Sequence, residues 1–291
     1  MNCLQGIIFK GIGGFYYVKT EDGKIYECKA RGIFRKEKIK PMIGDKVKIE
    51  IIDEAHGNIE EIMPRSTELI RPPVANIDLL VVVVAAKNPD PDYYFIDKLL
   101  VMAEARGIKP CICINKTDIQ NADEIKEIYK NTKYPIFETC AKNKGLPTEL
   151  YDYLAGKTTA FAGLSGVGKS SILNLLVDDE LETGAISDKI QRGKHTTRHV
   201  ELFELKNGGY VLDTPGFSSF EAEIMTPQEL CNYFPEMSEF LNGCRFSGCA
   251  HINEPDCIVK NAVKDGFISQ KRYESYCKMY DTLKQIKQWE L

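Results

Sequence analysis

The sequence predicts an α/β protein with a mostly parallel sheet, preceded by a small β-barrel and followed by a helical, cysteine-rich segment. Three observations carry this prediction. Short alternating strands separated by turn residues fill residues 1–66. From Ile77 onward, apolar strands alternate with helices, as in parallel α/β sheets. After Gly216 the pattern becomes helical around a group of cysteines.

Residues 1–66 are expected to form an oligonucleotide-binding (OB) barrel, with an SH3-like barrel as the alternative. Apolar and polar residues alternate in GIIFKGIGGFYYVKT and GDKVKIEII, and EDGKIYECKA predicts a hairpin that turns at Asp22-Gly23. No segment of this region is a convincing helix. Prolines at positions 64, 72 and 73 indicate a linker over residues 67–76.

The barrel region carries a concentration of positive charge, although the whole chain has a net charge of −4. Between Lys29 and Lys48 there are eight basic side chains and two acidic ones. Such a run is either a solvated face of strands and loops or a surface that contacts a phosphate backbone. Under the second interpretation, the candidate RNA-binding residues are Arg31, Arg35, Lys36 and Lys38.

An α/β domain is expected over residues 77–222. Its first strand, LLVVVVAA, is a continuous apolar run, which is typical of a strand covered on both faces. After the helix DKLLVMAEARG, the expected elements are the strand KPCICIN, the helix ADEIKEIYKN, the strand PIFETC, the helix PTELYDYLAG, the strand TTAFAG and the helix KSSILNLLV. Ligands of such sheets bind beyond the carboxyl ends of the strands, where polar motifs follow two of these strands.

The first of these motifs is a phosphate loop between a predicted strand and a predicted helix. It comprises Gly163, Leu164, Ser165, Gly166, Val167, Gly168, Lys169 and Ser170, and Ser171 follows in the helix. Its glycines let backbone N–H groups surround phosphates at a helix N-terminus. Lys169 is expected to reach the β- and γ-phosphates and Ser170 to bind magnesium.

The second motif, Asn115-Lys116-Thr117-Asp118, indicates which base is bound. A carboxylate such as Asp118 can accept hydrogen bonds from both N1–H and the exocyclic amine of guanine, and adenine has no such donor pair. After the next predicted strand, Cys140, Ala141 and Lys142 follow Thr139, and this turn could supply a backbone N–H to guanine O6. A plain turn at the strand end is nearly as good an interpretation of that segment.

Two further elements complete a guanine-nucleotide site. Asp213-Thr214-Pro215-Gly216 follows the predicted strand GGYVLD, where Asp213 would act at magnesium and the Gly216 N–H would sense the γ-phosphate. Upstream, RGKHTTRHV is a polar loop suited to closing over magnesium through Thr196 or Thr197. Chance occurrence of all four elements at strand ends is improbable.

The order of these elements is unusual, because the base-reading motif begins 48 residues before the phosphate loop (163 − 115). This order resembles that of the circularly permuted GTPases. With a front barrel and a cysteine-rich tail, the whole chain is similar to the bacterial GTPases that depend on the small ribosomal subunit. The resemblance implies GTP hydrolysis to GDP with Mg²⁺, stimulation by the small subunit, binding to its rRNA and a role in late subunit maturation.

The resemblance also implies a catalytic residue. The segment Asp213–Gly216 corresponds to the second switch of Ras-like GTPases, which place a water-orienting Gln just after its glycine. Here that position is Phe217. The resemblance implies that His195 orients the water instead, when the first switch, the loop RGKHTTRHV, becomes ordered. A flexible loop histidine without this role is an equally good interpretation of the sequence alone.

The tail, expected over residues 223–291, contains a candidate zinc site. Cys244, Cys249, His251 and Cys257 offer three thiolates and one imidazole, a closed tetrahedral set that suits a structural zinc ion. A helix is expected to start at Thr226-Pro227-Gln228-Glu229. In the final helix, the core face is expected at Tyr273, Tyr276, Tyr280 and Leu283, with Lys271, Arg272, Lys278, Lys284 and Lys287 at the remaining positions.

Composition sets the remaining expectations. The longest apolar run, Leu79 to Ala86, is too short to span a bilayer, and the N-terminus shows no signal peptide. We therefore expect a cytoplasmic protein, reduced cysteines and a monomer. Two other functions stay open. An ATP-using P-loop enzyme is opposed by Asp118, and a non-enzymatic RNA-binding adaptor with a vestigial nucleotide site is opposed by the intact Lys169, Ser170 and Asp213.

Overall fold

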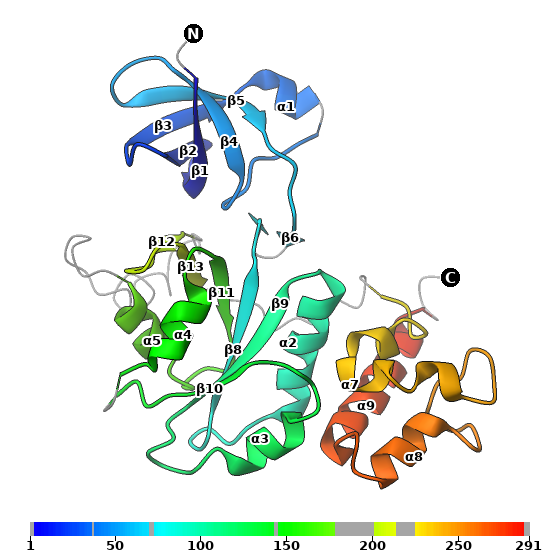
Figure 1. Ribbon diagram of the computed structural model, residues 1–291. Helices are drawn as coiled ribbons and strands as arrows, with labels where there is room; N and C mark the ends of the chain where they lie inside the picture. Colours follow the sequence, from blue (N-terminus) through cyan, green and yellow to red (C-terminus); the bar gives the residue numbers. More distant parts are fainter. Residues whose placement is uncertain are drawn as a thin grey trace. The chain divides into compact units, whose positions relative to one another are not determined.

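A computed structural model describes residues 3–36, 38–69, 73–142, 145–177, 201–213 and 225–287 (Figure 1). The chain divides into two compact units. The first contains Met1–Leu80, Gly145–Ala162 and Lys169–Phe217, and the second contains Val81–Lys144, Gly163–Gly168 and Ser218–Leu291. In the described ranges, no helix is long and apolar enough to cross a membrane.

The first unit begins with a closed five-stranded barrel in the order β1-β2-β3-β5-β4. Its strands are β1 (Cys3–Ile12), β2 (Phe15–Thr20), β3 (Ile25–Ala30), β4 (Lys46–Ile51) and β5 (His56–Ile62). The hairpin expected at Asp22-Gly23 joins β2 to β3, with Gly23 at φ +82°. Ile8, Val18, Ile49 and Ile59 are fully buried inside the barrel, as the alternating pattern predicts.

The barrel region differs from the prediction at two places. A short helix, α1 (Gly32–Lys36), lies within the basic stretch where strands and loops were expected, and Phe34 anchors it in the barrel core. The segment expected as a linker contains a two-stranded sheet, β6 (Glu68–Leu69) and β7 (Val74–Ala75). Leu69 and Val74 are buried, so packing has fixed part of this proline-flanked segment.

Six strands form the α/β sheet in the order β10-β9-β8-β11-β13-β12. They are β8 (Leu79–Ala85), β9 (Lys109–Asn115), β10 (Ile136–Glu138), β11 (Thr158–Ala162), β12 (Phe203–Glu204) and β13 (Tyr210–Asp213). The β9–β10 and β11–β13 pairs are parallel, and the edge strand β12 is antiparallel to β13. Every residue of β8 is buried, as expected of an apolar strand covered on both faces.

The helices of this domain follow the strands as predicted. They are α2 (Tyr93–Ala105), α3 (Asp123–Tyr129), α4 (Thr148–Leu154) and α5 (Lys169–Leu176). Helix α2 begins earlier than the sequence pattern suggested, because the Asp92 side chain caps it by accepting a hydrogen bond from the Phe95 N–H (3.0 Å).

The tail belongs to the second unit and is built from short helices around one long helix. Its elements are η2 (Leu230–Tyr233), α7 (Pro235–Ser238), η3 (Leu241–Gly243), α8 (Ile258–Lys264) and α9 (Gln270–Lys287). Thr226 and Glu229 form the expected reciprocal cap, but a turn and a 3₁₀-helix follow it where an α-helix was expected. Helix α9 packs beside α2 within this unit (Figure 1).

Candidate nucleotide and metal sites

Asn115, the last residue of β9, joins the base-reading motif to the phosphate loop. Its buried side chain donates from Nδ2 to the Val167 carbonyl (3.0 Å). Its Oδ1 accepts from the Thr139 hydroxyl (3.1 Å) and the Ala141 N–H (3.2 Å). Three segments that are distant in sequence therefore meet at one amide, which brings together the first two motifs and the 139–142 turn.

Lys116 supports the phosphate loop from the same side. Its backbone is left-handed (φ +63°), and its ammonium donates to the Gly166 carbonyl (2.7 Å) and to the Asn88 carbonyl. A single cation thus connects the phosphate loop to the loop that precedes α2. Asp118, two residues later, is exposed, as a group that reads a ligand base must be before the ligand binds.

Close packing explains two glycines of the phosphate loop. A Cβ on Gly163 would lie 2.3 Å from the Val83 carbonyl oxygen, and one on Gly168 would lie 2.2 Å from Nδ2 of Asn115. Gly168 also has φ +98°, which strains any other residue. The pattern predicted glycines that wrap a phosphate, and the structure adds that Gly163 and Gly168 make room for β8 and for Asn115.

The other predicted nucleotide residues occupy defined positions. Lys169, Ser170 and Ser171 form the first turn of α5, directly after the loop. Leu164 is half-buried and Ser165 exposed, while Cys140 is buried and Lys142 exposed. Asp213 ends β13 in register with Phe161 of β11. His195, Thr196, Thr197 and Gly216 lie outside the described residues.

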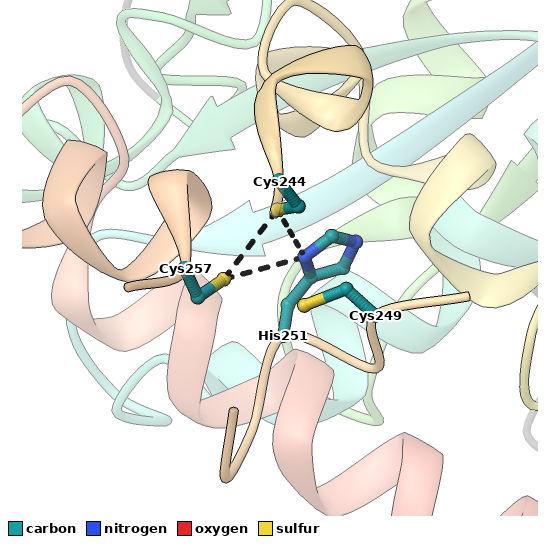
Figure 2. A group of neighbouring side chains, drawn as sticks. All are labelled: Cys244, Cys249, His251 and Cys257. Atoms are coloured by element: carbon teal, nitrogen blue, oxygen red, sulfur yellow. Dashed lines mark hydrogen bonds between the residues drawn. The ribbon is translucent and has the colours of Figure 1, made fainter. Parts of the chain in front are cut away.

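The four predicted metal ligands come together in the tail (Figure 2). The ligand atoms of Cys244, Cys249, His251 and Cys257 all lie within 4.8 Å of one another. His251 Nδ1 is 3.5 Å from the Cys244 sulfur and 3.4 Å from the Cys257 sulfur, and these two sulfurs are 3.9 Å apart. Ligand atoms around tetrahedral zinc are separated by roughly 3.5–3.8 Å. The donor set and its spacing therefore fit such an ion.

Helix α9 holds the backbone of this cluster. The Tyr273 hydroxyl donates to the His251 carbonyl (2.7 Å) and the Tyr276 hydroxyl donates to the Ala250 carbonyl (2.8 Å). Glu254 accepts from the Ala250 and Ile252 N–H groups and so closes the turn between the ligands. The tyrosine stripe is a core face, as predicted, and it also positions the loop that carries the candidate metal ligands.

Burial shifts the pKa of two of the candidate ligands, His251 and Cys249. It lowers the pKa of His251, which favours the neutral imidazole that a metal requires. Burial also raises the pKa of the Cys249 thiol to about 12. With its pKa raised, this half-buried thiol stays protonated until a cation binds beside it, so metal binding at Cys249 would release a proton.

The candidate RNA-binding residues lie in and around α1. Arg31 is exposed and forms an ion pair with Glu60, which partly neutralises it. Lys36 and Lys38 are exposed. Arg35 lies in α1, and its side chain is outside the described part. Nearby, the Lys29 ammonium lies 5.2 Å from the centre of the Phe15 ring, so a cation and an aromatic ring occur together on this barrel surface.

One prediction for the final helix is wrong. Arg272 was placed with the polar positions of α9, but its side chain is fully buried. Asp97 and Glu236, also buried, accept its hydrogen bonds. The sequence contained one usable signal, because Asp97 is a carboxylate within the otherwise apolar inner face of α2, and a buried acid requires a partner.

Comparison with known proteins decides the family. Residues 62–223 match the RsgA GTPase family and residues 5–59 match the RsgA N-terminal domain. The chain belongs to the RsgA GTPase family. The protein is thus a GTPase, and its fold prediction is confirmed: a circularly permuted α/β GTPase domain with an N-terminal OB-type barrel and a tail that carries a Cys/His cluster.

Individual relatives of the family cover nearly the whole chain. The protein named small ribosomal subunit biogenesis GTPase RsgA from Ruminiclostridium cellulolyticum is 50% identical over 292 residues, which is 98% of this chain and 95% of that protein. A protein of the same name from Agathobacter rectalis is 48% identical, with 97% and 98% covered.

Two solved structures are also similar. YjeQ from Thermotoga maritima has a TM-score of 0.84 and 38% identity, and the match covers 97% of this chain and 99% of that one. YloQ, described as a circularly permuted GTPase, has a TM-score of 0.82 and 38% identity, with 98% and 96% covered. Both motif order and fold are therefore shared with solved members of the family.

Proposed function

We propose that this protein is a small ribosomal subunit biogenesis GTPase, whose hydrolysis of GTP to GDP is stimulated by the small ribosomal subunit. The observation that carries the nucleotide assignment is the Asn115 side chain, which bonds at once to the phosphate loop and to the 139–141 turn. It joins base recognition to phosphate binding although the two motifs occur in reversed order. The partner assignment is supported by the names of the relatives.

Within this proposal the nucleotide residues have distinct roles. Asp118 accepts from guanine N1–H and the exocyclic amine. Backbone N–H groups of the loop at 163–170 bind the phosphates, and Lys169 stabilises the charge on the β- and γ-phosphates. Ser170 and Thr197 bind Mg²⁺, which Asp213 holds from the second switch, and the Gly216 N–H contacts the γ-phosphate. His195 positions the attacking water.

We further propose that the Cys/His cluster binds one structural Zn²⁺. The donor set supports zinc, because three thiolates and one imidazole form a closed soft site with no position for a reactant. The ligands would fix the loop between η3 and α8, while Tyr273 and Tyr276 orient it from α9. The zinc ion has no part in hydrolysis.

The barrel surface around α1 is the proposed contact for ribosomal RNA. Neutralising Arg31, Arg35, Lys36 and Lys38 together should weaken association with the small subunit and reduce its dependence on salt, because fewer counterions are then released. The same replacements should leave GTP affinity unchanged. Association that keeps its strength and salt dependence would exclude this surface.

The division into a barrel (1–66), linker (67–76), GTPase domain (77–222) and zinc-binding tail (223–291) remains part of this proposal, as do a monomeric state and a cytoplasmic location. Sedimentation of the purified chain tests the monomeric state. The small ribosomal subunit as partner supports the cytoplasmic location.

Turnover measurements test the function directly. GTP hydrolysis by the purified chain is measured alone, with small subunits and with large subunits, and ATP serves as the control nucleotide. We expect slow intrinsic turnover and strong stimulation only by small subunits and only with GTP. Use of ATP would favour a P-loop enzyme of another kind, and no turnover under any condition would favour a non-enzymatic adaptor. His195→Ala should remove the stimulated rate while nucleotide affinity is retained.

Base recognition has a sharper test in Asp118→Asn. Xanthine carries a carbonyl where guanine carries the exocyclic amine, and the Asn amide can donate to that carbonyl. The variant should lose affinity for GTP and hydrolyse xanthosine triphosphate with small-subunit stimulation. Asp123→Asn, the same change at an exposed carboxylate of α3, is the matched control. Unchanged preference for GTP in Asp118→Asn would contradict the assigned role.

A further inference from the structure

Helix α9 of the tail is attached to α2 through Arg272, which is fully buried. Its guanidinium donates to both carboxylate oxygens of Glu236 (2.7 and 3.1 Å) and to Oδ1 of Asp97 (2.6 Å). Its charge also lies 4.5 Å from the centre of the Phe234 ring. Glu236 belongs to α7 and Asp97 to α2, so one side chain connects the tail's two helical segments to the GTPase domain.

The Asp97 end of this connection is fixed by α3 as well. The Tyr129 hydroxyl donates to Oδ1 of Asp97 (2.8 Å), the same oxygen that Arg272 binds. Burial alone lowers the pKa of Arg272, but Asp97 and Glu236 outweigh this effect and hold that pKa well above its usual value. The guanidinium is therefore a permanent charge, and its geometry is set by two carboxylates on different elements.

The start of α2 faces the phosphate loop across a small cavity. Phe95 and Ile96, in its first turn, line the same narrow cavity as Gly163, Leu164 and Val167. Ile96 directly precedes Asp97. Four residues before the Asp92 cap, the Asn88 carbonyl accepts from Lys116, whose ammonium also binds the Gly166 carbonyl. Neighbouring residues of α2 thus line a cavity with the phosphate loop and bind the arginine of the tail.

The other side of α9 reaches the Cys/His cluster. Tyr273, next to Arg272, donates to the carbonyl of the ligand His251, and Tyr276 donates to the carbonyl of Ala250. The route from Gly166 through α2 and α9 to His251 contains only described residues of the second unit.

We propose that Arg272 is a positioning residue through which α2 couples the phosphate loop to the metal-binding tail. The coupling rests on the proposed function, because it requires a nucleotide at the phosphate loop. A nucleotide that orders this loop restrains the first turn of α2, and close packing transmits the restraint to Asp97 and Arg272. Coupling between two sites is reciprocal, so the state of the tail must change nucleotide affinity by the same factor.

Hydrogen exchange of the full, zinc-loaded chain, with and without GDP, tests this coupling. In the unmodified protein, GDP should slow exchange in the phosphate loop and, by about fivefold, at amides of α9. Arg272→Lys keeps the charge but cannot span both carboxylates. In this variant the phosphate loop should still respond to GDP, and the α9 response should disappear.

Two further variants complete the design. Tyr129→Phe removes only the hydroxyl that fixes Asp97, and it decides the question if Arg272→Lys loses its zinc or its folded tail. Lys133→Ala is the matched control, because it breaks an exposed ion pair between the GTPase domain and the tail residue Glu239, and it should retain the full α9 response.

Failure of the coupling and failure of the proposed function would give different results in this experiment. If GDP protects the phosphate loop of the unmodified protein but not α9, the coupling is wrong and the proposed function stands. The same conclusion holds if α9 of Arg272→Lys and of Tyr129→Phe responds to GDP as strongly as α9 of the unmodified protein. If GDP leaves the phosphate loop itself unprotected, the proposed function fails and the coupling fails with it.

Discussion

The barrel contacts the edge of the α/β sheet and the tail contacts helix α2, and the two contacts are of opposite kinds. The barrel contacts residues 201–204, the edge segment of the sheet. Two ion pairs, Lys10–Glu201 (3.3 Å) and Lys19–Glu204, and a backbone hydrogen bond from the Leu202 N–H to the Phe9 carbonyl (2.9 Å) make this contact. All four charged side chains are partly exposed. The tail instead contacts α2 through the fully buried Arg272.

This difference has a physical consequence. Exposed ion pairs contribute little and are screened by salt. A buried charge that loses a partner is left in a medium that cannot solvate it. The barrel can therefore change its contact with the edge segment at low cost, whereas the tail must move with α2. If the barrel binds RNA as proposed, we expect the barrel contact to be adjustable and the tail contact to be fixed.

The largest expected effect comes from Arg272→Met. This change leaves Asp97 and Glu236 buried without their counter-charge, and it should lower the free energy of unfolding by about 3–5 kcal/mol. Urea denaturation, followed by circular dichroism, measures it. Lys271→Ala removes the neighbouring exposed pair with Glu124 and should cost less than about 1 kcal/mol. Equal losses in both variants would mean that the buried and the exposed ion pairs stabilise the fold equally.

The barrel has an internal counterpart to this network. Asp45 is fully buried and accepts from Arg65 Nε and Nη2 (2.7 and 2.9 Å) and from the Met42 N–H (2.7 Å). Asp45→Asn should cost about 2 kcal/mol, less than Arg272→Met because Arg65 is partly exposed and can regain water. The same denaturation measurement ranks the losses of unfolding free energy in Asp45→Asn and Arg272→Met. Glu68→Gln, which changes the exposed partner of Arg65, is the control.

Two interactions hold the tail: the Cys/His cluster with its proposed metal, and the buried contact of Arg272 with α2. They should differ in their response to pH. Burial raises the pKa of Cys249 to about 12, so between pH 6.5 and 8 this thiol releases a proton when metal binds. Burial lowers the pKa of His251 from 6.5, so this imidazole is mainly neutral in the same pH range. Metal affinity should therefore rise with pH, by about tenfold per unit from Cys249 alone.

Competition with a chelator at several pH values measures this slope. The Arg272 guanidinium stays charged throughout the window, so the α2–α9 contact should not follow the same pH dependence. A metal affinity that is constant between pH 6.5 and 8 would show that Cys249 is not a ligand.

The smallest effect is expected where the barrel meets the edge segment. Replacing Lys10 and Lys19 together by Ala should change the free energy of unfolding by less than about 1 kcal/mol per pair, and the change should vanish at high ionic strength. Denaturation at low and high salt measures it. A large loss that persists in high salt would mean that the barrel is fixed to the sheet as firmly as the tail is to α2.

Much of this protein follows from local sequence. Alternation gave the barrel strands, and continuous apolar runs gave the central strands, because burial on one or both faces is a local property of a strand. The spacing of Cys244, Cys249, His251 and Cys257 indicated their cluster, because ligands within fourteen residues can close around one ion with little help from the rest of the fold. The helix α1 was missed, since five residues are too few to show a helical period.

Other features depended on contacts between distant segments. Arginine at position 272 of α9 is typical of a solvent-exposed position. Its burial becomes favourable only because Asp97 of α2 and Glu236 of α7 lie beside it. The sequence by itself determined the motifs and their permuted order, because each motif needs only a strand end and a turn. The tertiary structure alone decided that Asn115 holds the phosphate loop and that Arg272 holds the tail, because a buried polar group becomes stable only when its partners are in place.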